Sequence, residues 1–207
     1  RNFGNIICFL LTLIRRISSP FCRRTLPPVR KILFIKFIEQ GATVLAYDAI
    51  KTACDKAGRE NVYFAVFSEN REILEILDII PRENIFSIRN KGLFTFFIDM
   101  LTILVKIRRL KIDSTIDLEF FTRAPAIFAF LSGAKRRVGL HRFTSEVPYR
   151  GDLLTHRVNY NPYLHITKSY SLFLKALFAD HEDLPLLKMQ LDKDLKYSPA
   201  YNPSAAE

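Results

Sequence analysis

The stretch Ser114–Leu140, STIDLEFFTRAPAIFAFLSGAKRRVGL, predicts the fold of this chain. Its first residues, Ser114–Leu118, read as a short strand, and Thr122–Leu131 follows as a helical segment filled mostly by apolar side chains. Lys135–Leu140 is then expected to be the next strand. A strand, a helix and a second strand form a βαβ unit, and such units build parallel sheets.

Polar side chains gather where the first strand of this unit gives way to the helix. They are Asp117, Glu119, Thr122 and Arg123. In open α/β sheets, ligands bind outside the carboxyl ends of the strands. We therefore expect a functional site at this joint.

The remaining chain repeats the alternation of short apolar runs and helical segments. The predicted strands are 32–37, 62–67 and 84–88, the predicted helices are 43–57, 69–80, 93–110 and 163–178, and 141–161 is predicted to be a loop. This order predicts a doubly wound α/β domain with a parallel sheet over residues 31–180. Residues 181–207 turn polar and proline-rich, and we expect them to be a truncated inter-domain linker.

The composition fits one soluble globular domain. The 207 residues are 49% apolar and 25% charged, both ordinary values. The three cysteines, Cys8, Cys22 and Cys54, are odd in number and widely spaced, so we expect reduced thiols in a cytoplasmic protein. No carboxylate pair stands at ligand spacing, and no metal site is predicted.

The net charge of +10 is unevenly placed along the chain. Residues 1–31 hold seven basic residues and no acidic one, which leaves a net +3 for the rest. Phe3–Ile14 is mostly apolar but too short to span a bilayer. Residues 1–30 are therefore expected to be a leader whose interfacial helix binds an anionic membrane surface, followed by a proline-rich linker. The alternative is a solvated tail.

Phosphate-binding loops are not evident in this sequence. There is no P-loop and no G-x-G-x-x-G fingerprint, and the chain has only seven glycines. The turn before the predicted 43–57 helix contains Gly41 and Thr43, which could hold an anion at the helix N-terminus. The alternative is a tight turn that needs one glycine.

Two groups of basic side chains are further candidates for binding an acidic ligand. Lys135, Arg136 and Arg137 begin the last predicted strand, and arginine binds phosphate or carboxylate bidentately. His165 lies in the first turn of the predicted last helix, and Lys168 follows three residues later. The alternatives are a solvated strand edge and a partly exposed histidine at a helix start.

Three stretches resemble glycosyltransferase family 9, the ADP-heptose:lipopolysaccharide heptosyltransferases. They are Lys31–Ile50 (KILFIKFIEQGATVLAYDAI), Thr115–Leu140 (TIDLEFFTRAPAIFAFLSGAKRRVGL) and the helix from His165. The resemblance covers about residues 31–179 and implies the N-terminal half of a GT-B enzyme, which has two Rossmann-like domains. It also implies that the N-terminal domain binds the lipopolysaccharide acceptor. The nucleotide sugar, ADP-heptose, would bind to a C-terminal domain that this chain lacks, and no other cofactor is implied.

This sequence departs from the family pattern at two positions. Family members carry Gly-Asp in the first turn, where the Asp is thought to be the general base, but here the pair is Gly41-Ala42. Asp48 replaces a proline that is usual a few residues later. The nearest carboxylates are Glu39 and Glu119, which we take as candidate catalytic residues. The candidate acceptor-binding residues are Gly41, Thr43, Asp117, Arg123, Lys135, Arg136, Arg137, His165 and Lys168.

The resemblance implies a bacterial glycosyltransferase that acts on a lipopolysaccharide core or a related cell-surface glycan. It would work in the cytoplasm, peripherally at the inner face of the membrane, with a glycolipid acceptor as its partner. The 207 residues alone are expected to be inactive. The alternative is a non-catalytic acceptor-binding or membrane-surface module, or a fragment that lacks the donor domain. A nucleic-acid partner is not expected, because no basic-aromatic strand motif accompanies the charge.

Overall fold

The structure, a computed structural model, describes residues 2–18, 26–141 and 150–179 and contains a six-stranded sheet. The strand order is β3-β2-β1-β4-β5-β6, and every neighbouring pair is parallel. The strands are β1 (Ile32–Ile35), β2 (Val62–Phe67), β3 (Ile85–Ile88), β4 (Ser114–Asp117), β5 (Arg136–Leu140) and β6 (His156–Val158). The predicted parallel α/β fold is therefore confirmed.

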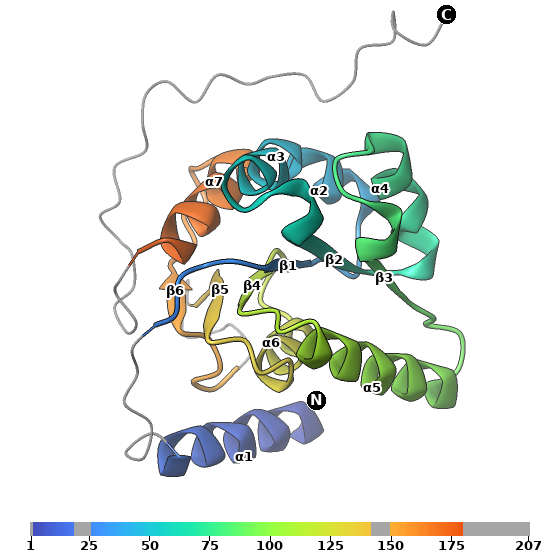
Figure 1. Ribbon diagram of the computed structural model, residues 1–207. Helices are drawn as coiled ribbons and strands as arrows, with labels where there is room; N and C mark the ends of the chain where they lie inside the picture. Colours follow the sequence, from blue (N-terminus) through green and yellow to red (C-terminus); the bar gives the residue numbers. More distant parts are fainter. Residues whose placement is uncertain (1, 19–25, 142–149, 180–207) are drawn as a thin grey trace, which may run out of the picture.

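Helices cover both faces of this sheet (Figure 1). One face carries α2 (Gln40–Leu45), α3 (Tyr47–Ala57), α4 (Arg71–Leu77) and α7 (Ile166–Leu177). The other face carries α1 (Asn2–Ser18), α5 (Leu93–Arg109) and α6 (Arg123–Leu131). Short 3₁₀ helices lie at Arg59–Asn61, Ser68–Asn70 and Arg82–Asn84.

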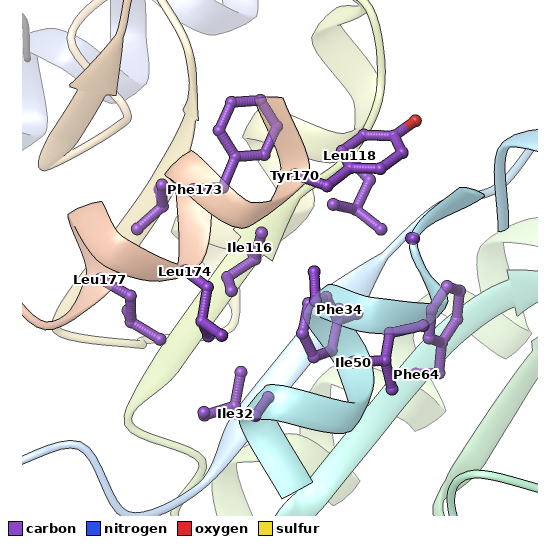
Figure 2. Close-up of a cluster of buried hydrophobic side chains, with 14 of the residues drawn as sticks. Ile32, Phe34, Ile50, Phe64, Ile116, Leu118, Tyr170, Phe173, Leu174 and Leu177 are labelled. Atoms are coloured by element: carbon purple, nitrogen blue, oxygen red, sulfur yellow. The ribbon is translucent and has the colours of Figure 1, made fainter. Parts of the chain in front are cut away.

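Two apolar clusters hold the three layers together. Ile32 and Phe34 of β1 point to the α3 and α7 side, whereas Leu33 and Ile35 point to α5 and α6. Because both faces are covered, β1 is apolar at every position, as is usual for central parallel strands. Figure 2 shows the first cluster, in which α7 lays Phe173 and three neighbouring side chains over β1 and β4.

The strand order reverses at β1, which pairs with β2 on one side and with β4 on the other. Ile35, at the end of β1, lies opposite Asp117, at the end of β4. In doubly wound sheets, this switch point opens a crevice at the carboxyl ends of the strands. The topology thus locates the candidate site beside Asp117.

Three predicted elements differ from the observed ones. The predicted 43–57 helix is two helices that meet at Ala46, where the chain bends and keeps Thr43, Ala46 and Ile50 buried. The predicted 69–80 helix ends at Leu77, because Asp78 takes a left-handed φ of 44°. The predicted 141–161 loop contains β6, which adds a sixth strand by pairing with β5. Tertiary pairing, not local periodicity, stabilises so short a strand.

Helix α1 packs on the domain through α6 and the segment that precedes β6. Cys8 is fully buried with Ala126 and Leu153. The Thr12 hydroxyl accepts a hydrogen bond from the Asp152 N–H at 2.9 Å, and Arg15 forms an ion pair with the Asp152 carboxylate at 3.2 Å. In the described ranges, no helix is long and apolar enough to cross a membrane. The predicted linker 181–207 lies outside the described residues.

Candidate functional site

A buried lysine joins two carboxylates at the carboxyl ends of β1 and β4. Lys36 directly follows β1, and its side chain is almost fully buried. Its ammonium group lies 3.0 Å from Glu39 Oε2 and 3.1 Å from Glu119 Oε2. The two acids that the sequence proposed as catalytic therefore lie at one site, and they share one cation.

Glu119 is held rigidly within this group. Its Oε1 accepts hydrogen bonds from the backbone N–H groups of Phe37 and Ile38, at 2.8 and 2.9 Å, while its Oε2 binds Lys36. The residue is only 4% exposed. These bonds tie the turn after β1 to the end of β4, so Glu119 shapes the turn that carries Glu39.

Glu39 is the accessible member of the group. Its side chain is 63% exposed, and among the described residues it bonds only to Lys36. The residue precedes α2 with a φ of 69°, a conformation that costs a non-glycine residue roughly 1–3 kcal/mol. A carboxylate in this position faces solvent at the switch point and can meet a ligand there.

A second buried pair lies beside the first. Asp117 is fully buried and binds Arg150 through Oδ2 at 3.1 Å and the Glu119 N–H through Oδ1 at 2.9 Å. Burial raises the pKa of Asp117 to about 6, although the charge of Arg150 opposes the rise. Burial likewise lowers the pKa of Arg150. Gly139 of β5 lies against Asp117, where an added Cβ would come within 3.1 Å of the Asp117 Cβ.

Three buried hydroxyl groups have no hydrogen-bond partner in the described part of the chain. They belong to Thr43 of α2, Thr115 of β4 and Tyr170 of α7. Burial raises the pKa of Tyr170, and the charges of Glu119 and Glu39 add to the rise. Figure 2 shows the Tyr170 ring beside Leu118, with its hydroxyl pointing away from the apolar side chains around it. Unsatisfied buried hydroxyls call for an explanation, and a bound ligand would provide one.

Aromatic side chains border the Asp117 pair. Phe120 and Phe121 follow β4 and pack edge-on against Tyr160, with ring centroids 5.3 and 5.9 Å away. The guanidinium of Arg150 lies 5.7 Å from the Phe121 ring centre. Phe120 remains 39% exposed, so part of this edge is both apolar and accessible.

The predicted cluster of Lys135, Arg136 and Arg137 lies at the other edge of the sheet. Arg136 pairs in register with Ser114, at the amino end of β4, whereas Asp117 ends that strand. Arg136 donates to the carbonyls of Leu177 and Ala179, and Arg137 donates to those of Leu153 and Ala134. Both arginines are buried, and Lys135 is exposed. The structure does not bring these three cations to the site of Glu39 and Glu119.

The other predicted residues lie nearer that site. Arg123 begins α6 and packs beside Gly4 of α1. His165 caps α7 by accepting the Thr167 N–H, and Lys168 is exposed one turn later. Both helices begin at the carboxyl edge of the sheet, because each follows a parallel strand. An added Cβ at Gly41 would contact nothing, so packing around this position does not demand a glycine.

Two residues of this site, Lys36 and Tyr170, were not predicted from the sequence. Lys36 had a detectable signal, because it is the one charged residue in the otherwise apolar run Ile32–Ile38. Tyr170 resembles an ordinary core aromatic in a helix. Within the described ranges, no three metal-ligating side chains come together.

Solved structures of glycosyltransferases superpose on this chain. A family 9 glycosyl transferase from Veillonella parvula superposes with a TM-score of 0.56 at 15% identity, over 76% of this chain. The E. coli heptosyltransferase WaaC with ADP-2-deoxy-2-fluoro heptose superposes with a TM-score of 0.58 at 14% identity, over 71% of this chain. The structure of WaaC with ADP superposes with a TM-score of 0.59 at 12% identity, over 73% of this chain. The chain has the fold of family 9 glycosyltransferases.

The likeness to family 9 is one of structure. The chain spans 43% of the V. parvula protein and 48% of WaaC, which is less than half of either. No protein-family model matches its sequence, and no curated protein does. At 12–15% identity, the likeness to family 9 establishes the fold and not the reaction.

Proposed function

We propose that this chain is the acceptor-binding domain of a heptosyltransferase-type glycosyltransferase. The full enzyme would transfer a sugar from a nucleotide-sugar donor to a lipopolysaccharide core or a related cell-surface glycan. The observation that supports this most is the group of Lys36, Glu39 and Glu119 at the switch point of a family 9 fold. It combines an accessible carboxylate, a fixed cation and a crevice where such sheets bind ligands.

Glu39 is our candidate for the general base. An inverting transfer needs a base within hydrogen-bond reach of the attacking hydroxyl. Glu39 is exposed and has only one bond to Lys36, whereas both oxygens of Glu119 are occupied by Lys36 and two backbone N–H groups. Between the two candidates, we therefore assign proton transfer to Glu39 and assign Glu119 to positioning the turn.

The acceptor would be held by groups around this carboxylate. Thr43 and Tyr170 offer hydroxyls that can bond to sugar hydroxyls. Arg123 and Lys168 are cations at the same edge that suit acidic or phosphorylated sugars, and His165 lies beside Lys168 at the start of α7. The donor, with ADP-heptose as the leading candidate, would bind to a separate domain, consistent with the lack of a glycine-rich phosphate loop.

Acceptor binding can be tested on this chain by calorimetric titration with a lipopolysaccharide-core oligosaccharide, with and without its phosphates. We expect binding of the phosphorylated glycan and no low-micromolar affinity for ADP. Tyr170→Phe removes only an unpaired hydroxyl, so it should keep the stability and weaken acceptor binding several-fold. Tyr63→Phe on β2 is the matched control and should change neither. If no core oligosaccharide binds even at millimolar concentration, the proposal fails.

Catalysis is tested in an enzyme that contains this domain together with its donor domain. General-base catalysis contributes about 100- to 10,000-fold. Glu39→Gln should lower kcat by about that factor with the fold intact, as judged by circular dichroism. If Glu39→Gln retains most of the activity while a folded Glu119→Gln loses it, the base is Glu119.

A second function, acceptor binding without catalysis, is favoured by one specific observation. Ala42 stands where the resemblance places the catalytic aspartate, and it cannot take a proton. A measurable turnover that depends on Glu39 would exclude this alternative. Acceptor binding with no turnover in the presence of a functional donor domain would establish it.

A further inference from the structure

Exposed apolar side chains are concentrated on two helices of this protein. Of 17 large apolar residues exposed in the described ranges, six lie on α1 and six on α5. Those on α1 are Ile6, Phe9, Leu10, Leu13, Ile14 and Ile17, and those on α5 are Leu93, Phe94, Phe97, Ile98, Leu101 and Val105. A concentration of this kind on a folded domain marks a surface that binds something apolar.

The outward face of α1 is more apolar than the face that packs on the domain. Its inward side uses Thr12 and Arg15, both hydrogen-bonded to Asp152, with the small Cys8 between α1 and α6. Its outward residues recur at helical spacing, three and four positions apart, and form one continuous stripe. A helix that only needed to cover the domain would have turned this stripe inward.

Helix α5 is apolar on both sides. Ile103 and Ile107 face inward and fill the cluster beneath the sheet. Phe94, Leu101 and Val105 point outward at helical spacing, and Phe94 is 78% exposed. The inward face already provides the packing that holds α5 in place, so the outward stripe adds nothing to the core.

Both stripes lie on helices that contact α6. In Figure 1, α1 and α5 lie on the same side of the sheet, with α6 next to both. Arg108 of α5 donates to the Leu131 carbonyl at the end of α6, and Cys8 of α1 packs against Ala126 in α6. One broad partner could therefore contact both helices.

Basic residues lie near the ends of both helices. Helix α1 has no acidic residue, and the one acid of α5, Asp99, is paired with Arg89 at 2.8 Å. The exposed basic residues on or next to the two helices are Arg16, Lys91, Lys106, Arg108, Arg109 and Lys111. An apolar stripe with cations at its margins suits an anionic lipid bilayer, in which acyl chains meet the apolar side chains and headgroups meet the cations.

We propose that α1 and α5 together form a membrane-docking surface for an anionic bilayer. Each helix would lie in the interface with its outward stripe among the headgroups and upper acyl chains. A second copy of the chain fits this surface less well, because a symmetric contact would bring the same cations against each other. The inferred surface extends the predicted leader contact to α5, which is 75 or more residues away in sequence, and it does not depend on the proposed transferase activity.

The proposal is tested by sedimenting the full chain with vesicles. Vesicles of phosphatidylglycerol and phosphatidylcholine are compared with pure phosphatidylcholine at low and high salt. Three double variants are measured: Phe9→Ser with Leu13→Ser on α1, Phe94→Ser with Leu101→Ser on α5, and the control Ile76→Ser with Tyr163→Ser. All six side chains are already exposed, so the variants should keep the fold, which circular dichroism verifies.

We expect anionic vesicles to bind the wild type, and each of the α1 and α5 variants to lower the partition coefficient at least about tenfold. The control should stay within twofold of the wild type, and high salt should weaken binding without abolishing it. Failure of the wild type to bind anionic vesicles would overturn the proposal, as would unchanged binding of the α5 variant. If ultracentrifugation shows a dimer that both variants dissociate while vesicle binding is unaffected, the surface is an interface between copies.

Discussion

Replacing Lys36 by methionine should destabilise the domain strongly, because it leaves a buried carboxylate without its cation. Glu119 would keep its hydrogen bonds to the N–H groups of Phe37 and Ile38 but lose the ion pair at 3.1 Å. Removing one partner of a buried pair costs about 3–5 kcal/mol. Because the two N–H bonds remain, we expect the lower end, about 3 kcal/mol.

Urea unfolding at pH 7, followed by circular dichroism, measures this loss. In a domain of this size, about 3 kcal/mol corresponds to a fall in Tm of roughly 6–12 °C. Glu39→Gln is the matched comparison, because Glu39 binds the same ammonium group but its side chain is 63% exposed. An exposed ion pair contributes about 0–1 kcal/mol, so this variant should stay close to the wild type.

Double variants separate the two contacts of Lys36. Lys36→Met combined with Glu119→Gln removes both buried charges and should recover most of the stability, which gives a coupling energy of about 2 kcal/mol. Lys36→Met combined with Glu39→Gln should show a coupling below about 0.5 kcal/mol. The reasoning is refuted if Lys36→Met costs less than about 1 kcal/mol, or if the coupling to Glu39 equals that to Glu119.

Further predictions concern single residues around the site and in the core. The pKa of Asp117, about 6, lies above the unfolded value near 3.9, so the folded state binds the extra proton between these values. This group therefore makes stability fall as the pH rises from about 4 to about 6, and Asp117→Asn should remove that slope from urea midpoints measured across the range. Gly139→Ala should cost about 1–3 kcal/mol, because its Cβ would meet the Asp117 Cβ at 3.1 Å. Gly41→Ala, in open space within α2, should be neutral or slightly stabilising in the same unfolding assay. Phe173→Ala empties a fully buried position in α7 and should cost about 3–5 kcal/mol.

Local sequence patterns predicted the class of fold correctly. The apolar runs that form β1 and β2 are buried on both faces of the sheet. The helical segments between the strands favour crossover connections, which join parallel strands. The strand–helix joint also predicted a candidate site at the edge beside Asp117, because the carboxyl ends of parallel strands share one edge. Local patterns did not predict the interruption of the helix at Ala46 or the three-residue strand β6, since both depend on contacts with distant elements.

The alternation of strands and helices can be read from the sequence, and it implies the parallel sheet and the edge where Glu39 and Glu119 lie. Which charged residues come together at the candidate site depends on tertiary packing. Lys36 donates a hydrogen bond to Glu119, which is 83 residues away in the sequence, and Arg136 donates one to the Pro27 carbonyl, which is 109 residues away. In the sequence, Arg136 and Arg137 resemble anion-binding residues, but in the fold both are buried and donate hydrogen bonds to backbone carbonyls. Periodicity reports which face of an element is buried, but the partner of a buried charge is set by chain segments that pack together only in the folded state.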